Sequence, residues 1–115
     1  MYLNRITLVG FLGDKPDIRT AGGDGKKVAA FRVATSTTWK DKAGNEQSET
    51  QWHQVEVWGG WVDSVAKLEK GAKVYVEGEM KYREWDKPDG SKGYGASVTA
   101  RVVVEMVHVK QSDRR

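Results

Sequence analysis

Most of this 115-residue chain alternates apolar and polar residues with a period of two, which is typical of β-strands. Runs of this kind cover residues 3–12, 26–39, 51–59, 72–85 and 94–110, and a shorter piece lies around Ile18 and Arg19. Polar, Gly-rich turns separate the runs at 21–25, 40–49 and 86–93, and Asp89-Gly90 indicates a hairpin tip in the last of them. The pattern therefore predicts an all-β domain of five main strands.

One stretch between the third and fourth runs has helical spacing instead. In GGWVDSVAKLEKG (59–71), a helical face would carry Trp61, Val62, Val65, Ala66 and Leu68, with Trp61 packed inward. Gly71 would stop the helix, with Lys67 and Lys70 in the last turn. This order predicts a five-stranded Greek-key barrel of the OB-fold with one α-helix between strands three and four. An SH3-like barrel or a small sandwich would also fit the strands, but neither needs the helix.

Composition narrows the classes of function. The chain has no cysteine and two histidines, so it offers no disulfide, no Cys-ligated metal and no convincing His cluster. We therefore expect neither a metal, nor a cofactor, nor enzymatic activity. No apolar run of about 18 residues and no secretory signal is visible, so we expect no membrane span, and the absence of cysteine fits a cytoplasmic protein. The net charge of +3 permits an anionic partner without requiring one.

The stretch QWHQVEVWG (51–59) places large apolar side chains on an unexpected face. In a strand, Trp52 and Trp58 lie on the face with Gln54 and Glu56, whereas Val55 and Val57 lie on the other face with His53. The valine face predicts the core. On the last strand, a similar alternation predicts one apolar face formed by Ala96, Val98, Ala100, Val102, Val104 and Met106. The two tryptophans must then be covered by another surface or by a ligand.

Two more of the five tryptophans lie beside cations. Trp85 shares a strand face with Lys81 and Arg83, and Trp39 precedes Lys40, although its face stays open because alternation often breaks near strand ends. Indoles stack on bases of any sequence, for about 1–3 kcal/mol per base, while nearby cations contact phosphates. A lone tryptophan of this kind would more often pack in an interface or under a loop. Several together favour a single-stranded nucleic acid.

Three segments carry a resemblance to a known family. NRITLVGFLGDKPDIR (4–19), VATSTTWKDKAGNEQSETQWHQVEVWG (33–59) and KGAKVYVEGEMKYREWDKPDGSKGY (70–94) resemble the bacterial single-stranded DNA-binding proteins, in the same order and over nearly the whole chain. The resemblance implies an OB-fold, a homotetramer and sequence-independent binding of single-stranded DNA in replication, repair and recombination. It also implies a place at the nucleoid in the cytoplasm.

The same resemblance assigns site residues. Its stacking aromatics correspond to Trp39, Trp52, Trp58 and Trp85, and its cations near DNA to Arg5, Arg19, Lys40, Lys42, Lys81 and Arg83. Its subunit contacts correspond to Leu3, Ile6, Leu8, His53 and Tyr75. Two positions that are often basic in the family hold Gln54 and Glu84 here, which would weaken binding or shift the path of the DNA.

The family usually continues into a flexible linker and an acidic tip that recruits replication and repair proteins. Here we expect a DNA-binding domain at 1–110 and a short tail at 111–115 that ends in basic residues, either because the chain is cut or because it is a short variant. An OB-fold accessory protein that binds both single-stranded DNA and a protein partner stays an alternative. An OB-fold nuclease would need clustered acids, and an oligosaccharide-binding barrel would not need the cations.

Overall fold

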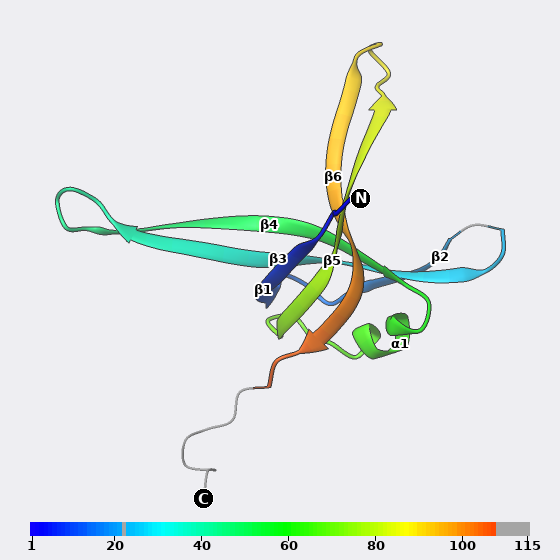
Figure 1. Cartoon of the computed structure of the whole chain (residues 1–115), viewed down its shortest axis with the longest axis horizontal. Coiled ribbons are helices and arrows are strands. Elements are labelled where there is room, and N and C mark those ends of the chain that lie inside the picture. The colour runs from blue at the N-terminus through cyan, green and yellow to red at the C-terminus, as the bar shows by residue number, and fades with distance from the viewer. Residues whose placement is uncertain (22, 108–115) are drawn as a thin grey trace, which may run out of the picture.

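The computed structural model describes residues 1–21 and 23–107, which form six strands and one short helix (Figure 1). The elements in chain order are β1 (Ile6–Leu12), β2 (Asp17–Ala21), β3 (Lys26–Lys40), β4 (Glu46–Trp58), α1 (Trp61–Ala66), β5 (Lys73–Asp86) and β6 (Lys92–Glu105). The end of the last predicted strand, 108–110, and the predicted tail at 111–115 lie outside the described residues.

Five of the strands close into a barrel. The sheet has the order β1-β5-β6-β4-β3-β2. An additional β1–β3 pairing closes β1, β5, β6, β4 and β3 into the barrel and leaves β2 outside it. All pairs are antiparallel except β4–β6, where Val55 and Glu56 lie beside Val98 and Thr99 in parallel. The piece around Ile18 becomes β2, which pairs with the first part of β3. The helix lies between the third and fourth barrel strands, so the predicted OB-fold is confirmed.

The core is built from the valine face predicted for residues 51–59. Val55 and Val57 are buried there with Val33 of β3 and Val74 and Val76 of β5. Each such side chain removed from water contributes about 1.5–3 kcal/mol. The helix adds Val62 and Val65 to the same cluster. Trp52 and Trp58, on the other face of β4, are exposed as the alternation predicts.

The helix is shorter than predicted. It ends at Ala66, so Lys67 and Lys70 follow the last turn instead of occupying it. The chain turns at Gly71, which has a φ of +88° and whose N–H donates to the Leu12 carbonyl oxygen at 2.9 Å. This hydrogen bond ties the segment to β1, and a left-handed φ favours glycine.

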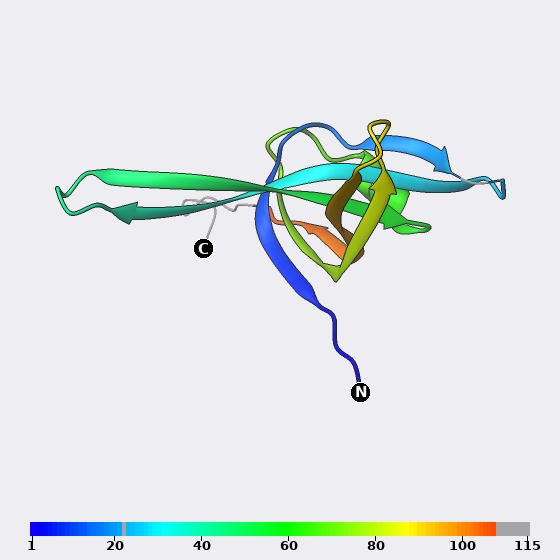
Figure 2. The ribbon, with the colours of Figure 1, turned by 90° about the horizontal axis from the view of Figure 1, so that it is seen from above.

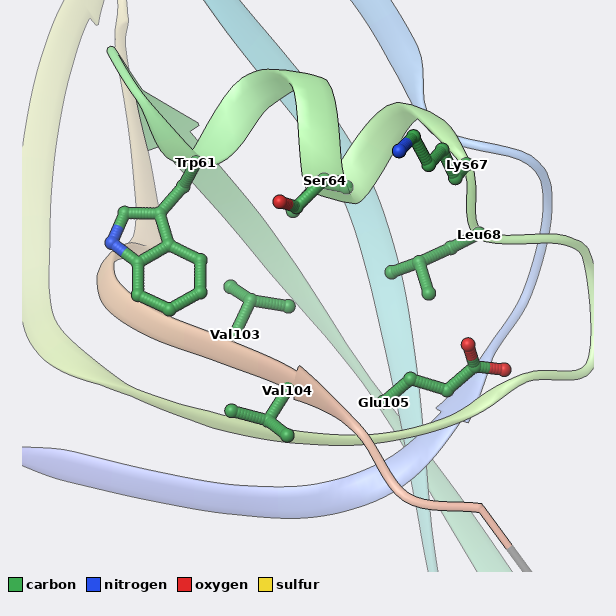
Figure 3. Close-up of a pocket in the computed structure, with 8 residues that line it drawn as sticks. Trp61, Ser64, Lys67, Leu68, Val103, Val104 and Glu105 are labelled. Atoms are coloured by element: carbon green, nitrogen blue, oxygen red, sulfur yellow. The ribbon is translucent and has the colours of Figure 1, made fainter.

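The prediction that Trp61 packs inward is wrong, because its side chain does not point into the core. Its side chain is 37% exposed and lines a shallow pocket, where the indole lies beside Val103 and Val104 of β6 (Figure 3). The first helical residue lies at the rim of the barrel, and the two helical positions that reach the core are Val62 and Val65.

A β-bulge changes the face predicted for β6. Ala100 pairs with Gly78 and Val102 with Glu77, so Arg101 is an extra residue on β6. A bulge reverses which side chains point inward. Val103 is therefore buried, and the prediction that Val104 and Met106 share the inner face is wrong because both are exposed. Ala96 is exposed as well, since it lies beyond the barrel.

Two hairpins extend from the barrel as arms, β3–β4 and β5–β6 (Figures 1 and 2). Half of the predicted loop at 40–49 is strand, because β3 continues to Lys40 and β4 begins at Glu46. All residues at 36–40 and 46–52 are exposed, so both faces of this arm are open to solvent. The predicted hairpin tip at 86–93 is confirmed, with Gly90 at a φ of +87°.

Candidate nucleic-acid interface

Three adjoining hollows form one surface on the side of the barrel. Their volumes are about 170, 220 and 220 Å³, and Gln54 of β4 lines all three. Ser97 connects the first with the second, and Arg19 and Ala30 connect the second with the third. We call this surface the Gln54 surface. The residue that the sequence placed between two tryptophans is therefore its centre.

Trp52 lies at one side of the Gln54 surface and lines its smallest hollow. The indole rests on two neighbours. A Cβ atom added at Gly13 would lie 2.5 Å from its Cζ3 atom, and the Arg32 guanidinium carbon lies 4.8 Å from the ring centroid. A cation at that distance is attracted by the ring quadrupole. These two neighbours support the indole, while the side chain is still 49% exposed.

Trp85 lies on the β5–β6 arm in a similar setting. Cβ atoms added at Gly93 and Gly95 would lie 2.4 and 3.2 Å from its ring atoms, so these glycines leave the space that the indole fills. The Arg83 guanidinium carbon lies 6.0 Å from the ring centroid. Arg83 also lines the second hollow, so this arm continues from the Gln54 surface. The role of Gly93 and Gly95 was not visible in the sequence.

The remaining two tryptophans differ in placement. The four predicted stacking residues are each 41–49% exposed. Trp58 shares the outer face of β4 with Trp52, and their separation is about 20 Å along the strand. Trp39 pairs with Gln47 near the tip of the β3–β4 arm, and it alternates in step with the buried Val33. It therefore lies on the opposite face of this two-stranded arm from Trp52.

Of the predicted phosphate contacts, the structure brings Arg19 and Arg83 together in the second hollow. Arg19 also pairs with Asp17 at 2.7 Å. The other four lie elsewhere on the barrel and its arms: Arg5 just before β1, Lys40 and Lys42 around the end of β3, and Lys81 on β5, where it pairs with Glu79 at 2.9 Å.

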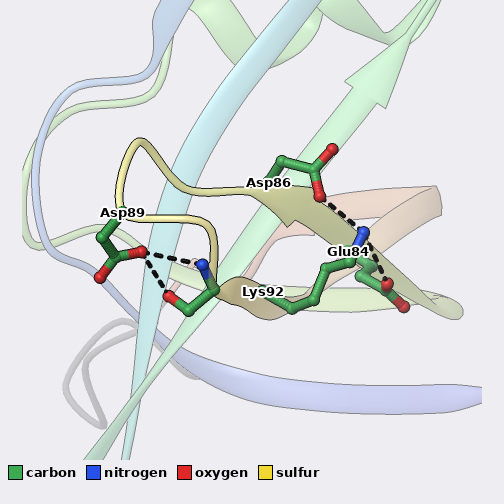
Figure 4. A network of polar contacts seen from close by, with 5 residues as sticks. Glu84, Asp86, Asp89 and Lys92 are labelled. Atoms are coloured by element: carbon green, nitrogen blue, oxygen red, sulfur yellow. Dashed lines mark hydrogen bonds and ion pairs between the residues drawn. The ribbon is translucent and has the colours of Figure 1, made fainter.

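Two cations that were not predicted from the sequence lie near the non-basic positions: Arg32 is the cross-strand partner of Gln54, and Lys92 forms an ion pair with Glu84. Lys92 of β6 lies 3.6 Å from Glu84 and 2.5 Å from Asp86 (Figure 4). The signal for Arg32 was present, because a five-residue turn at 41–45 fixes the register that puts residue 32 beside residue 54.

The predicted subunit contacts have varied positions. Leu3 is exposed and Ile6 partly buried, but Leu8 is only 8% exposed and belongs to the core. Because Leu8 is enclosed by its own chain, it offers almost no surface to a partner and is removed from this group. His53 is half-buried and its Nε2 lies 2.9 Å from the Thr35 hydroxyl.

Tyr75 is part of a polar chain on the outer face of β5. Its hydroxyl donates to Glu77 at 3.0 Å, and Arg101 donates to the same carboxylate at 2.8 Å. The Arg101 and Tyr75 hydrogen bonds lower the pKa of Glu77 below its ordinary value. The hydrogen bond to Glu77 in turn raises the pKa of Tyr75.

Within residues 1–21 and 23–107, no group of three or more His, Cys, Asp or Glu side chains could hold a metal ion. In the same residues, no helix has the length and apolar character needed to cross a membrane.

A closed five-stranded barrel with exposed tryptophans and cations beside a hollowed face defines an OB-fold protein of the nucleic-acid-binding kind. The chain belongs to the single-strand binding protein family, whose model matches residues 3–107.

Curated relatives agree with the family. The chain is 39% identical over 115 residues to "Single-stranded DNA-binding protein 1" of Xylella fastidiosa, covering 98% of this chain and 83% of the relative. It is 38% identical over 99 residues to the "Single-stranded DNA-binding protein" of Rickettsia felis, of which it spans 64%.

Solved structures share the fold. One described as "Plasmodium falciparum SSB complex with ssDNA" matches 93% of this chain and 97% of its own, with a TM-score of 0.82 and 32% identity. A deletion mutant of the single-stranded DNA binding protein from Thermus aquaticus matches 91% of this chain and 51% of its own, with a TM-score of 0.77 and 28% identity.

Proposed function

We propose that this protein binds single-stranded DNA without sequence preference and covers it during replication, repair and recombination. The observation that carries the proposal is the Gln54 surface, which has Trp52 at one side and continues through Arg83 to Trp85. Neither stacking on an indole nor contact with a phosphate depends on which base is present, so such a surface binds single-stranded DNA of any sequence. Family membership and the relatives' names support the same ligand.

In this mechanism the exposed indoles stack on unpaired bases and the cations track the backbone. The proposed stacking residues are Trp39, Trp52, Trp58 and Trp85, and the proposed phosphate contacts are Arg5, Arg19, Lys40, Lys42, Lys81 and Arg83. Because paired bases hide their faces, the protein stabilises the unpaired state and shifts the hairpin or duplex equilibrium by mass action. No step requires a cofactor. The proposed place of action is the nucleoid in the cytoplasm.

We also propose that the working form is a homotetramer. The outer face of β1, β5 and β6 carries exposed apolar side chains, with Val9 beside Tyr75 and Tyr75 beside Val104 in the register. In the described residues β1 pairs with β3 only at Phe11 and Leu12, which leaves the rest of that edge open for a second copy. Leu3, Ile6 and His53 are the other proposed contacts.

Light scattering should give a mass four times that of one chain, and Val9→Glu should lower the measured mass.

The proposed ligand is tested with dye-labelled oligo-dT and a duplex of equal length. We expect fluorescence anisotropy to show tight binding of the single strand at low salt and much weaker binding of the duplex, because only unpaired bases expose faces to the indoles. Equal affinity for both would contradict the stacking mechanism and leave only charge attraction.

A further inference from the structure

Arg32 has an unusual double contact for an exposed cation. On β3 it alternates with the buried Phe31 and Val33, so it points out of the barrel toward the Gln54 surface. Its guanidinium carbon lies 4.8 Å from the centre of the Trp52 ring, and its Nη2 lies 3.2 Å from Oδ2 of Asp14. One cation therefore contacts both a proposed stacking residue and an anionic oxygen.

The position that the Asp14 carboxylate occupies at Arg32 also suits a phosphate. A guanidinium binds carboxylates and phosphates through the same N–H donors, and its plane can lie on an aromatic ring at the same time. The Asp14 pair is weak and exchangeable because the Arg32 and Asp14 side chains are 44% and 69% exposed. The Asp14 carboxylate thus marks a position for an anionic oxygen beside Trp52.

We propose that Arg32 is a further contact for single-stranded DNA, at which a backbone phosphate replaces Asp14 while a base stacks at Trp52. The inference rests on the proposed function and deepens it. Arg32 lies across from Gln54, where the sequence lacks a cation, so the positive charge at this place comes from β3 instead of β4. Trp52 and Arg32 act as one unit, which contacts a base and its phosphate together.

The first test removes the charge of Arg32. We expect Arg32→Gln to flatten the plot of log K against log salt by about 0.7 and to weaken oligo-dT binding about fivefold at ~0.1 M salt, because one counterion-releasing contact is lost. Arg32→Lys should restore the slope. Lys67→Gln is the matched control, since Lys67 is an exposed cation at the pocket under α1. A slope unchanged in Arg32→Gln would overturn the proposal.

The second test asks whether Asp14 acts through Arg32. Asp14→Asn should tighten binding a few-fold at low salt, since the phosphate no longer competes with a carboxylate. In an Arg32→Gln background the same change should have much less effect. Asp24→Asn, which removes a carboxylate paired with Lys26 at 3.8 Å, is the control for general charge and should act equally in both backgrounds. An Asp14 effect of equal size in both backgrounds would overturn the exchange.

The wild-type protein separates this inference from the function on which it rests. If wild type binds oligo-dT with a salt-dependent affinity and the Arg32 variants match it, the inference fails and the function stands. If wild type does not bind, the proposed function itself fails. Thermal melting of each variant confirms that the barrel is folded, which we expect because the Arg32 side chain is exposed.

Discussion

At the scale of single residues, the tryptophans show how this protein keeps large apolar groups in water. Trp52 packs against Gly13 and Arg32, and Trp85 packs against Gly93 and Gly95. In each case one part of the indole is supported by backbone without a side chain, while about half of it stays accessible. A supported ring loses little further freedom on binding, which favours affinity.

Trp52→Ala should weaken binding of oligo-dT by about 1–3 kcal/mol, the usual loss when a stacked base loses its aromatic partner. Anisotropy titration measures the loss, and the melting temperature should change little because the indole is 49% exposed. Trp61→Ala is the matched control, because Trp61 is also exposed but lies at the pocket under α1. Equal effects of both changes would place Trp52 outside the interface.

Glu77 should contribute to the pH dependence of stability. Its pKa is lowered by hydrogen bonds from Arg101 and Tyr75, so its carboxylate stabilises the fold above the unfolded pKa, and this contribution is lost as the pH falls through the folded value. Urea unfolding at about pH 6 and about pH 3 measures the free energy of unfolding at each pH. Between the higher and the lower pH, this free energy should fall less for Glu77→Gln than for wild type. Glu46→Gln, on the exposed arm, should behave as wild type does.

At the scale of elements, the sequence predicted most strands because β3, β4 and β5 alternate regularly. The two outer tryptophans of β4 followed from the same alternation. The bulge at Arg101 could not be predicted, since it depends on how β5 and β6 pair and leaves no signal in the residue types of β6. The start of β4 at Glu46 was also missed, because a hairpin without a buried face lacks the apolar signal that marks a strand.

The pairing of Arg32 with Gln54 also depends on how two strands pair. Cross-strand neighbours depend on register, and the polar stretch at 40–49 predicts a loop, which leaves the β3–β4 register undefined from the sequence. Trp61 was misplaced for a related reason. Helical spacing places it on the inner face, but a helix of six residues makes less than two turns at the barrel end.

Gly93 should control the position of the Trp85 indole ring. A Cβ atom added there would lie 2.4 Å from Cε2 of the indole, so Gly93→Ala should displace the ring and weaken oligo-dT binding by up to the 1–3 kcal/mol of a stacked base. The melting temperature should change little, because the ring is free to move into solvent. Gly60→Ala is the control, since nothing lies within 4 Å of its added Cβ atom. Unchanged affinity in Gly93→Ala would remove Trp85 from the interface.

At the scale of the whole molecule, the arms set the shape. The radius of gyration is 17.5 Å, whereas a compact chain of this length has about 13 Å. The difference reflects the two hairpins that leave the barrel in separate directions (Figure 2). Their length is explained if DNA and neighbouring subunits cover them, because exposed two-stranded ribbons are only marginally stable alone.

The salt dependence of binding measures how many cations the whole surface contributes. If the six phosphate contacts of the proposed function all engage, log K should fall against log salt with a slope near −4, from about −0.7 for each contact on a single strand, and Arg32 as a seventh contact should bring the slope to about −5. An oligo-dT titration from about 0.05 to about 0.5 M salt gives this slope. A slope near zero would mean that the cations do not touch the backbone.

The most direct measurement of the central claim is the intrinsic tryptophan fluorescence during a titration with oligo-dT at low salt. Four of the five tryptophans are proposed to stack on bases, and stacked indoles lose emission, so we expect strong quenching that saturates with binding. The quenching should shrink in Trp52→Ala and persist in Trp61→Ala. Binding without any quenching would overturn the stacking mechanism, because the DNA would then bind without contacting the indoles.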